Sequence, residues 1–250
     1  MKKNLLKEKI TNKKYVIGTW SSLGSTNVVE VLGMSDLDYV IIDMEHGLID
    51  MQNCQNMVRV LENCGCAPLI RSQDNNKQNI LKLLESGVNS IMIPHIDTVK
   101  KAEDVVSYCK YFPHGERGIS PYTRLHEYDH LNLDKKTKNI NKNTFISVLV
   151  EGKLGLSNLH EIAKVKYIDM IYFGLFDVCQ SLGLPGQINH PKVIKEVKRL
   201  KSILTKNNKF SGSMAPDMSY VKLLKKLGFE FIAYLNDAAA IKNYFNQNLN

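Results

Sequence analysis

The sequence contains no long apolar segment. No hydrophobic run approaches the ~18 residues that a membrane-spanning helix requires. The first seven residues, MKKNLLK, also lack the apolar region of a signal peptide. Taken together, these absences predict a soluble, cytoplasmic protein that has no membrane partner.

Cysteine is scarce as well. The chain has five cysteines, an odd number, and none of them forms a CxxC pair or stands at zinc-ligand spacing from a histidine. Neither a disulfide framework nor a structural zinc site is therefore indicated. We expect reduced thiols in a cytosolic compartment.

Motifs for binding nucleic acids and nucleotides are also missing. Lysine and arginine outnumber aspartate and glutamate by 33 to 25, which gives a formal net charge of +8. The basic residues fall on helical faces without interleaved aromatic residues, so a solvated lysine-rich surface is favoured over a nucleic-acid-binding one. No G-x-G-x-x-G follows the first strand, and no glycine cluster fits a P-loop. A positive surface potential would instead favour an anionic small-molecule substrate.

What the sequence does contain is a regular alternation of strand-like and helix-like segments. Short runs rich in β-branched and aromatic residues predict strands at residues 15–20, 38–42, 67–70, 90–93, 144–150, 170–173, 210–214 and 231–235. Apolar residues at helical spacing lie between these runs, for example at residues 51–63 and 190–206. Such an alternation, repeated eight times, predicts a (β/α)8 barrel and favours it over an open doubly wound sheet.

The barrel is expected to form a single domain over residues 1–250, because no linker or internal repeat divides the chain. Residues 1–13 are expected to be a short amino-terminal extension, and residues 246–250 a disordered, asparagine-rich tail. Residues 114–143 form the longest stretch without clear periodicity. We expect this stretch over the active-site face or at a subunit contact.

Polar side chains follow several predicted strands at their carboxyl ends, where (β/α)8 enzymes hold their catalytic groups. The second strand ends in Asp43, Glu45 and His46. An imidazole titrates near neutral pH, which suits proton abstraction and return. His46 is therefore a candidate acid/base, and a histidine at a helix start without chemical function is the alternative interpretation.

A cation and two further carboxylates end three other strands. Arg71 could hold a carboxylate or enolate oxygen through two parallel hydrogen bonds. Glu151 and Asp177 follow the fifth and sixth strands. Two neighbouring carboxylates repel each other, and a shared divalent cation with oxygen ligands, Mg²⁺ or Mn²⁺, would relieve that repulsion. The alternative role for both acids is to cap the helices that follow them.

These residues resemble the HpcH/HpaI class II pyruvate aldolases, relatives of the citrate lyase β-subunit in the phosphoenolpyruvate/pyruvate barrel superfamily. The similarity runs from Gly18 to about Ala240, nearly the whole chain. Segments similar to the family's motifs occur in the family's order: Asp43-Met44-Glu45-His46, Ile70-Arg71, Leu84-Glu85-Ser86-Gly87, Ile93-Pro94, Pro113-His114-Gly115-Glu116-Arg117-Gly118 and Asn189-His190-Pro191. Several matches in the right order are more specific than any single one.

The resemblance implies a class II aldehyde-lyase. Such an enzyme cleaves or forms a 4-hydroxy-2-oxo acid from pyruvate, or a related 2-oxo acid, and an aldehyde. Glu151 and Asp177 would bind the divalent cation, which could be Mg²⁺, Mn²⁺ or Co²⁺. Arg71 would stabilise the enolate, and His46, oriented by Glu85, would be the acid/base.

The resemblance also implies how the rest of the site and the assembly are built. Gly174, Phe176 and Asp177 would bind substrate together with Arg71. Asp43 and Glu45 would have supporting roles. The family is usually hexameric, a trimer of dimers that exchange their last helices, so we expect a homo-oligomer, a homohexamer if the chain follows its family.

Three positions depart from the family pattern. Leu149 stands where the family has a glutamine, and Phe176 is large where a small residue lines the pyruvate pocket. Leu235 replaces a glycine near the last strand. These departures point to a changed donor or acceptor.

Acceptor choice in such a barrel is made by loops. We expect the loops that hold Arg117, Tyr122, Arg124 and His126 to make it. Two other functions remain open alternatives. One is a citrate-lyase-like lyase that acts on a longer or CoA-linked acid, and the other is a catalytically divergent barrel that only binds a metabolite.

Overall fold

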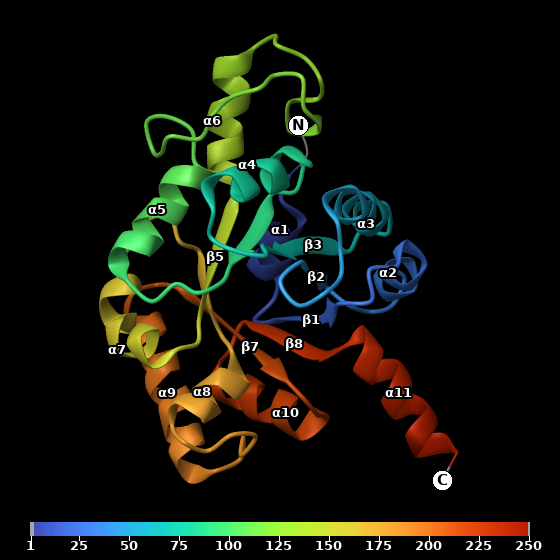
Figure 1. Cartoon of the computed structure of the whole chain (residues 1–250), viewed down its shortest axis with the longest axis vertical. Coiled ribbons are helices and arrows are strands. Elements are labelled where there is room, and N and C mark those ends of the chain that lie inside the picture. Colours follow the sequence, from blue (N-terminus) through green and yellow to red (C-terminus); the bar gives the residue numbers. More distant parts are fainter. Residues whose placement is uncertain (1–2, 250) are drawn as a thin grey trace.

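Eight parallel strands form a closed barrel in the computed structural model, which describes residues 3–249 (Figure 1). They are β1 Val16–Ser21, β2 Tyr39–Asp43, β3 Ala67–Arg71, β4 Ser90–Ile93, β5 Phe145–Val150, β6 Met170–Phe173, β7 Phe210–Ala215 and β8 Phe231–Asn236. Strands adjacent in the chain pair with each other, and β8 pairs with β1 to close the ring. The predicted (β/α)8 fold is confirmed, and each strand begins and ends within one residue of its predicted position.

Helices alternate with the strands, and most of them cover the outside of the barrel. They are α1 Leu5–Asn12, α2 Thr26–Gly33, α3 Met51–Asn63, α4 Lys77–Glu85, α5 Val99–Cys109, α6 Leu133–Asn143, α7 Lys153–Ile162, α8 Leu175–Ser181, α9 Pro191–Lys206, α10 Met218–Leu227 and α11 Asp237–Asn248, with a short 3-10 turn at Arg124–His126. α3 and α9 confirm the helices predicted at residues 51–63 and 190–206. Four helices, α1, α6, α7 and α8, lie where no helix was predicted.

Alternate residues of each strand face opposite sides of the barrel wall. Tyr39 and Ile41 of β2 pack in the barrel interior, whereas Val40 and Ile42 pack against the surrounding helices. Asp43 follows Ile41 by two residues, so it also faces the barrel interior at the end of β2. Arg71 is its register partner at the end of β3. The period-two pattern of the strands therefore directs polar side chains into the carboxyl-terminal mouth of the barrel.

The amino-terminal extension closes the other end of the barrel. Leu6 and Ile10 of α1 are buried in the same apolar cluster as the residues of the barrel interior. The Asn4 side chain donates to the backbone oxygens of Asn89 and Asn143, both at 2.8 Å. Residues 1 and 2 lie outside the described part of the chain. The predicted extension thus contains a helix that plugs the amino-terminal end.

The segment between α5 and β5 also lies at the amino-terminal end. Arg124 donates to the backbone oxygen of Ser86 at 3.0 Å, just before β4, and pairs with Glu62 at 2.6 Å. Lys110 donates to the oxygens of Asn141 and Thr144, at the start of β5. The expectation that residues 114–143 lie over the active-site face is wrong, because α5 runs antiparallel to the strands and returns the chain to where they start. Their place at a subunit contact stays a prediction.

The carboxyl-terminal helix leaves the barrel. α11 begins directly after β8 and extends away from the body of the molecule (Figure 1). It continues through Asn248, so the predicted tail at residues 246–250 starts inside this helix, and residue 250 lies outside the described part. Exchange of α11 between subunits stays a prediction. Across residues 3–249, no helix is both long and apolar enough to cross a membrane.

A first prediction concerns the contact between β1 and β2. Gly18 faces Tyr39, and a methyl group at Gly18 would lie only 2.7 Å from two ring carbons of Tyr39, next to that residue's backbone oxygen. We expect Gly18→Ala to lower the free energy of unfolding by about 1–3 kcal/mol, since the β2 backbone cannot yield. Urea unfolding measures this change. Gly118→Ala is the matched control, because a methyl group there meets open space, and an equal loss in both variants would contradict the prediction.

Candidate active site

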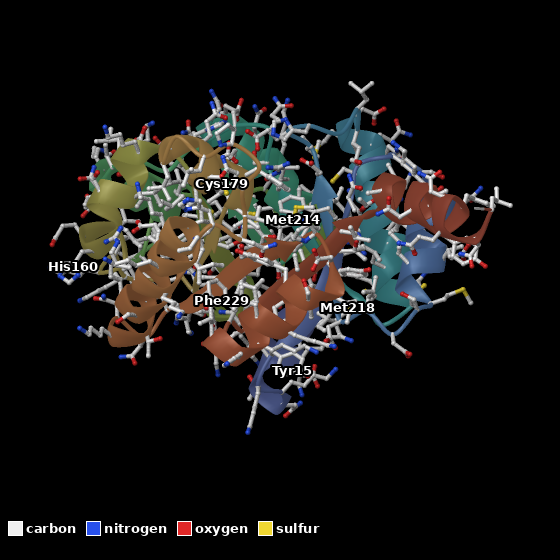
Figure 2. All side chains as sticks on the ribbon, turned by 90° about the horizontal axis from the view of Figure 1, so that it is seen from below. Tyr15, His160, Cys179, Met214, Met218 and Phe229 are labelled. Carbon is white, nitrogen blue, oxygen red and sulfur yellow. The ribbon has the colours of Figure 1, made fainter. Side chains whose placement is uncertain are left out.

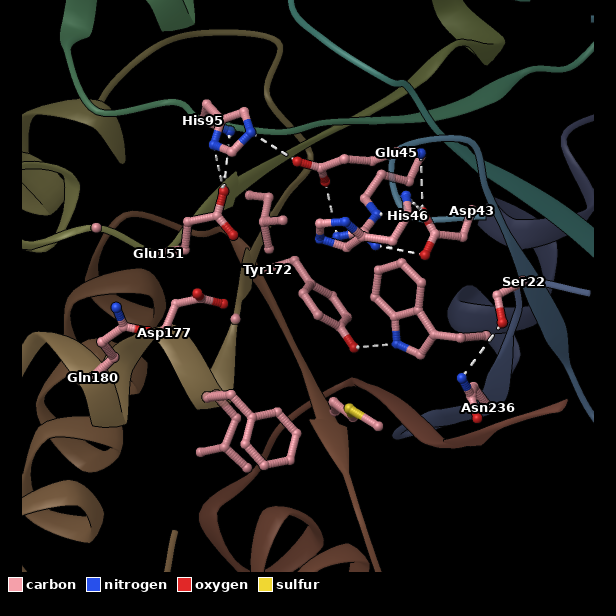
Figure 3. A pocket seen from close by; sticks show the side chains of 18 of the residues that line it. Ser22, Asp43, Glu45, His46, His95, Glu151, Tyr172, Asp177, Gln180 and Asn236 are labelled. Atoms are coloured by element: carbon pink, nitrogen blue, oxygen red, sulfur yellow. Dashed lines mark hydrogen bonds and ion pairs between the residues drawn. The ribbon is translucent and has the colours of Figure 1, made fainter. Parts of the chain in front are cut away.

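A cavity of about 910 Å³ opens at the carboxyl ends of the strands (Figure 3). It brings together all but one of the residues predicted for the site. Those that line it are Asp43, Glu45, His46, Arg71, Glu151, Gly174, Phe176 and Asp177. They come from four strand ends that are far apart in the sequence. The closed barrel therefore gathers the predicted cation, carboxylates and imidazole around a single space.

Arg71 is held in place by two carboxylates and an indole. Its Nε and Nη2 donate to the two oxygens of Asp43, at 2.9 and 2.6 Å. Its Nη1 lies 2.9 Å from Glu45 Oε2, and its guanidinium stacks over the Trp20 ring at 4.4 Å. Arg71 and Asp43 are both buried. We call the two parallel hydrogen bonds between Arg71 and Asp43 the fork. The fork fixes the plane of the guanidinium, which a lysine at the same position could not reproduce.

Asp43 also organises the loop that follows β2. Its Oδ1 accepts hydrogen bonds from the backbone amides of Glu45, at 3.1 Å, and of His46, at 3.2 Å. Asp43 thereby fixes both the guanidinium of Arg71 and the start of the loop that carries His46. The His46 side chain is exposed at the lip of the cavity.

His95 joins two of the carboxylates, and sequence reasoning missed it. Its Nε2 lies 2.7 Å from Glu45 Oε1 and its Nδ1 lies 2.9 Å from Glu151 Oε1 (Figure 3). The signal that could have found it is its place directly after β4 and Pro94, the same kind of strand-end position as Arg71. Other cavity residues without a prediction include Trp20, Ser22, Tyr172, Gln180, Met214 and Asn236.

Glu151 and Asp177 converge on Gly174. A methyl group placed on Gly174 would lie 2.7 Å from Asp177 Oδ2 and 3.4 Å from Glu151 Oε2, so the two carboxylate oxygens face the same point. Only glycine leaves that space open. Gly152 caps α7 and Gly174 caps α8, and neither acid caps the helix that follows it. The alternative role of these acids as helix caps is therefore wrong.

The cavity carries more negative than positive charge. Four carboxylates, from Asp43, Glu45, Glu151 and Asp177, face one guanidinium and the imidazoles of His46 and His95. Burial raises the pKa of Glu151, and the charges of Asp177 and Glu45 raise it further against the opposing effect of His95. The ionised form of Glu151 is thus disfavoured unless additional positive charge is supplied.

These residues fit a divalent cation. The oxygens of Glu151 and Asp177 offer hard ligands, and the space at Gly174 lies beside both. Among residues 3–249, ligand atoms of Glu45, His95 and Glu151 also lie within 4.8 Å of one another, close enough to hold one ion. Burial is the main cause of the raised pKa of Glu151, and a bound cation would offset both that effect and the repulsion from Asp177 and Glu45.

Aromatic side chains form the inner wall of the cavity. Trp20 donates through Nε1 to the Tyr172 hydroxyl at 3.2 Å, and the two rings meet edge to face. Burial raises the pKa of Tyr172, so its phenol stays protonated at neutral pH. Leu149 is buried at the cavity floor, whereas Phe176 is 45% exposed at the rim. Phe176 therefore leaves the cavity open.

Glu85 and the expected acceptor loops lie elsewhere. Glu85 ends α4 on the amino-terminal side, where its charge acts on Tyr111 and Arg117. No hydrogen bond or ion pair within residues 3–249 joins it to His46, so the expected pairing is not made inside one chain. The loops holding Arg117, Tyr122, Arg124 and His126 do not line the cavity either. The expectation that they select the acceptor is wrong for the site of their own chain, because they lie at the opposite end of the barrel.

Comparison with known proteins agrees with this geometry. A family model described as HpcH/HpaI aldolase/citrate lyase matches residues 16–239. A 5-keto-4-deoxy-D-glucarate aldolase of Shigella boydii is 29% identical over 240 residues, which cover 96% of this chain and 93% of that protein.

Solved structures share the fold. An HpcH/HpaI aldolase from Desulfitobacterium hafniense superposes with a TM-score of 0.91 at 25% sequence identity, covering 98% of this chain and 95% of that one. A citrate lyase β-subunit from M. tuberculosis, complexed with oxaloacetate and magnesium, superposes with a TM-score of 0.54 at 13% identity, over 90% of this chain and 93% of that one. The second likeness is one of fold alone.

The raised pKa of Glu151 predicts how stability depends on pH. A glutamate whose pKa is raised by folding stabilises the fold most below the ordinary glutamate pKa of about 4.3, and this contribution is lost as the pH rises through the raised value. Glu151→Gln cannot ionise. In buffer with EDTA we expect it to unfold at a higher temperature than the unmodified protein at pH 7, with the difference vanishing near pH 4.

Thermal unfolding followed by circular dichroism provides the measurement. Glu103→Gln on the outer face of α5 is the control, since Glu103 is exposed and outside the cavity. If the metal-free Glu151→Gln variant is no more stable than the unmodified protein at pH 7, the electrostatic description of the cavity is wrong.

Proposed function

The chain belongs to the HpcH/HpaI aldolase/citrate lyase family, and from that premise we propose that it is a metal-dependent aldolase. It would cleave or form a 4-hydroxy-2-oxo acid, with pyruvate or a related 2-oxo acid as donor and an aldehyde as acceptor. The Shigella boydii relative, named as an aldolase of a keto-deoxy sugar acid, supports this class of substrate.

One observation carries the proposal. Arg71, His46, Glu151 and Asp177 all line one cavity at the carboxyl ends of the strands. Aldol cleavage needs a base for a hydroxyl proton, positive charge for an enolate oxygen and a site that orients the 2-oxo acid. The cavity contains a residue suited to each of these tasks.

Glu151 and Asp177 would hold the divalent cation. When bound, such an ion supplies Lewis-acid polarisation of the keto oxygen of the substrate. The negative charge of the cavity supports its presence, since an anionic 2-oxo acid would otherwise approach four carboxylates. The amide groups that follow Gly174 lie next to these ligands and would contact the substrate carboxylate.

Arg71 would stabilise the enolate oxygen. Its contacts with Asp43 and Glu45 leave Nη1 and Nη2 each with one further N–H, and the Trp20 ring covers one face of the guanidinium. These contacts exist before substrate arrives, so little rearrangement is needed when charge moves onto oxygen. Preorganised donors of this kind are a major source of rate enhancement.

His46 would move the proton. In the cleavage direction its imidazole would accept the proton of the C4 hydroxyl, the C3–C4 bond would break, and the aldehyde would leave. The bonding electrons would remain as the enolate of the 2-oxo acid, and protonation at C3 would then give the free acid. The exposed position of His46 at the cavity lip supports a role at the acceptor end of the substrate.

The walls of the cavity bear on the range of substrates. Leu149 replaces a polar side chain with an apolar one at the floor, and Phe176 adds an aromatic rim. Both support a donor or acceptor that carries an apolar portion. A space of about 910 Å³ could accommodate a small 2-oxo acid together with an aldehyde. Room for both reactants supports catalysis over a divergent barrel that only binds a metabolite.

Activity gives the most direct test. We expect a screen that pairs pyruvate and oxaloacetate with simple and sugar aldehydes to yield aldol products in the presence of Mg²⁺ or Mn²⁺. Arg71→Lys should lower kcat by roughly 10²-fold or more, because one donor of the preorganised pair is lost. Glu151→Ala, or EDTA, should abolish turnover. The reverse reaction is followed by the rate at which pyruvate is released.

Two results would oppose the proposal. Full turnover in metal-free enzyme would show that the reaction does not need the metal. Normal activity of Arg71→Lys would show that the paired contacts between Arg71 and Asp43 are not needed for catalysis. Arg59→Lys on α3 is the control for a general effect of the substitution, since Arg59 is exposed and does not line the cavity.

We also propose that the enzyme is a homo-oligomer and that α11 packs against a second copy. Ile241, Tyr244 and Phe245 are 47%, 65% and 55% exposed, and their spacing places them on one side of the helix. An apolar face of this kind on an extended helix supports burial against another protein surface.

Light scattering coupled to size exclusion tests this assembly. The unmodified chain should elute as an oligomer, and Phe245→Glu should shift it to a lower mass because a charge would be buried in the contact. Lys242→Glu on the same helix changes the charge beside the apolar face and should leave the mass unchanged. A monomeric unmodified chain would refute the assembly without affecting the proposed chemistry.

A further inference from the structure

His95 lies between two carboxylates of the cavity. Its Nε2 is 2.7 Å from Glu45 Oε1 and its Nδ1 is 2.9 Å from Glu151 Oε1 (Figure 3). Its backbone amide also donates to Glu151 Oε1, at 3.3 Å. His95 therefore contacts Glu151, one of the two proposed metal-binding acids, through both its side chain and its main chain.

The backbone at His95 is held in an uncommon conformation. Its φ of 60° lies in the left-handed region, directly after Pro94. The next residue anchors the turn, because the amide of Ile96 donates to the oxygen of Leu149 at 3.2 Å. A non-glycine residue is held in this region only by its surroundings, and such strain is concentrated at functional sites. The strained turn directs the imidazole into the cavity.

Glu45 and Glu151 lie on opposite sides of the His95 ring, one at each ring nitrogen. Glu45 is fixed by Arg71, whose Nη1 lies 2.9 Å from Oε2, which leaves Oε1 of Glu45 to accept the Nε2–H of His95. With the proton on Nε2, the lone pair of Nδ1 faces the carboxylate of Glu151. Two lone pairs 2.9 Å apart repel each other unless a proton or a metal cation accepts both.

We propose that His95 is a direct metal ligand through Nδ1, sharing the cation with Glu151, and that Glu45 orients the ring from the other side. A histidine that ligates a metal with one nitrogen and donates its other N–H to a carboxylate is the usual arrangement at metal centres. Among residues 3–249, His95, Glu45 and Glu151 have ligand atoms within 4.8 Å of one another. The inference rests on the proposed metal site and specifies the type of metal it takes.

A nitrogen ligand changes the metal that the site prefers. Carboxylate and water ligands suit Mg²⁺, whereas imidazole favours ions later in the transition series, such as Co²⁺ and Zn²⁺. A site with His95 among its ligands should therefore bind Co²⁺ or Zn²⁺ more tightly than Mg²⁺. A site made of Glu151 and Asp177 alone would lack this added preference.

Isothermal titration of the EDTA-treated full chain with Co²⁺ and with Mg²⁺ tests the inference. His95→Asn tolerates the left-handed backbone and replaces the ring nitrogen with an amide. We expect this variant to lose about 10–100-fold in Co²⁺ affinity, with little change for Mg²⁺. His160→Asn on α7 is the matched control, because His160 lies at the outer edge of the molecule and its side chain is 58% exposed (Figure 2).

A second measurement needs no substitution. Electron spin echo spectra of the unmodified protein loaded with Mn²⁺ should contain a nitrogen coupling that changes when histidine is labelled with ¹⁵N. The absence of any such coupling, or a Co²⁺ affinity that His95→Asn leaves unchanged, would overturn the inference and leave His95 as a protonated bridge between two carboxylates.

The outcomes also separate this inference from the proposed function. If Glu151→Ala abolishes metal-dependent turnover while His95→Asn leaves metal affinity unchanged, the aldolase proposal stands and the role of His95 falls. If a histidine-derived coupling is present but no aldol reaction depends on metal, His95 is a metal ligand and the proposed aldolase function is wrong.

Discussion

The site depends on the buried fork between Arg71 and Asp43. These two residues are register partners at the ends of adjacent strands, so the barrel itself brings them together. A buried ion pair adds little net stability, because both charges lose hydration when they are buried. Its value here is positional. One carboxylate fixes the guanidinium plane and, through two backbone amides, the loop that carries His46.

The remaining charges of the cavity are arranged around this fork. Arg71 also holds Glu45, Glu45 holds His95, and His95 contacts Glu151 at the end of the neighbouring strand β5. A continuous series of polar contacts thus links β2, β3, β4 and β5. Asp177 lies beyond its end, and its carboxylate faces that of Glu151 across Gly174. The two carboxylates that lack a cationic side chain between them, those of Glu151 and Asp177, thus lie together in one corner of the cavity.

Much of this organisation could be predicted from the sequence. Strand ends are visible as apolar runs that stop at polar residues, which is why Asp43, Arg71 and Glu151 were predicted and found in one cavity. His95 was missed because its direction depends on a left-handed turn, which tertiary contacts impose. Periodicity also cannot tell which end of the barrel an irregular segment occupies. For that reason the expectation that residues 114–143 lie over the active-site face was wrong. The helices α8 and α6 were not predicted because α8 is short and α6 is mostly polar.

The carboxyl-terminal helix is tied to the cavity by its first residue. Asp237 is buried and accepts hydrogen bonds from the Ser21 hydroxyl and from the backbone amides of Ser22 and Leu23, in the loop after β1. Ser22 lines the cavity, so the anchor of α11 is also a support of the substrate entrance. A tilt of α11 would therefore shift Ser22 at the rim of the cavity through its hydrogen bond to Asp237. If α11 packs against a second copy as proposed, that contact would act on the rim through Asp237 and would not touch the chemical groups inside the cavity.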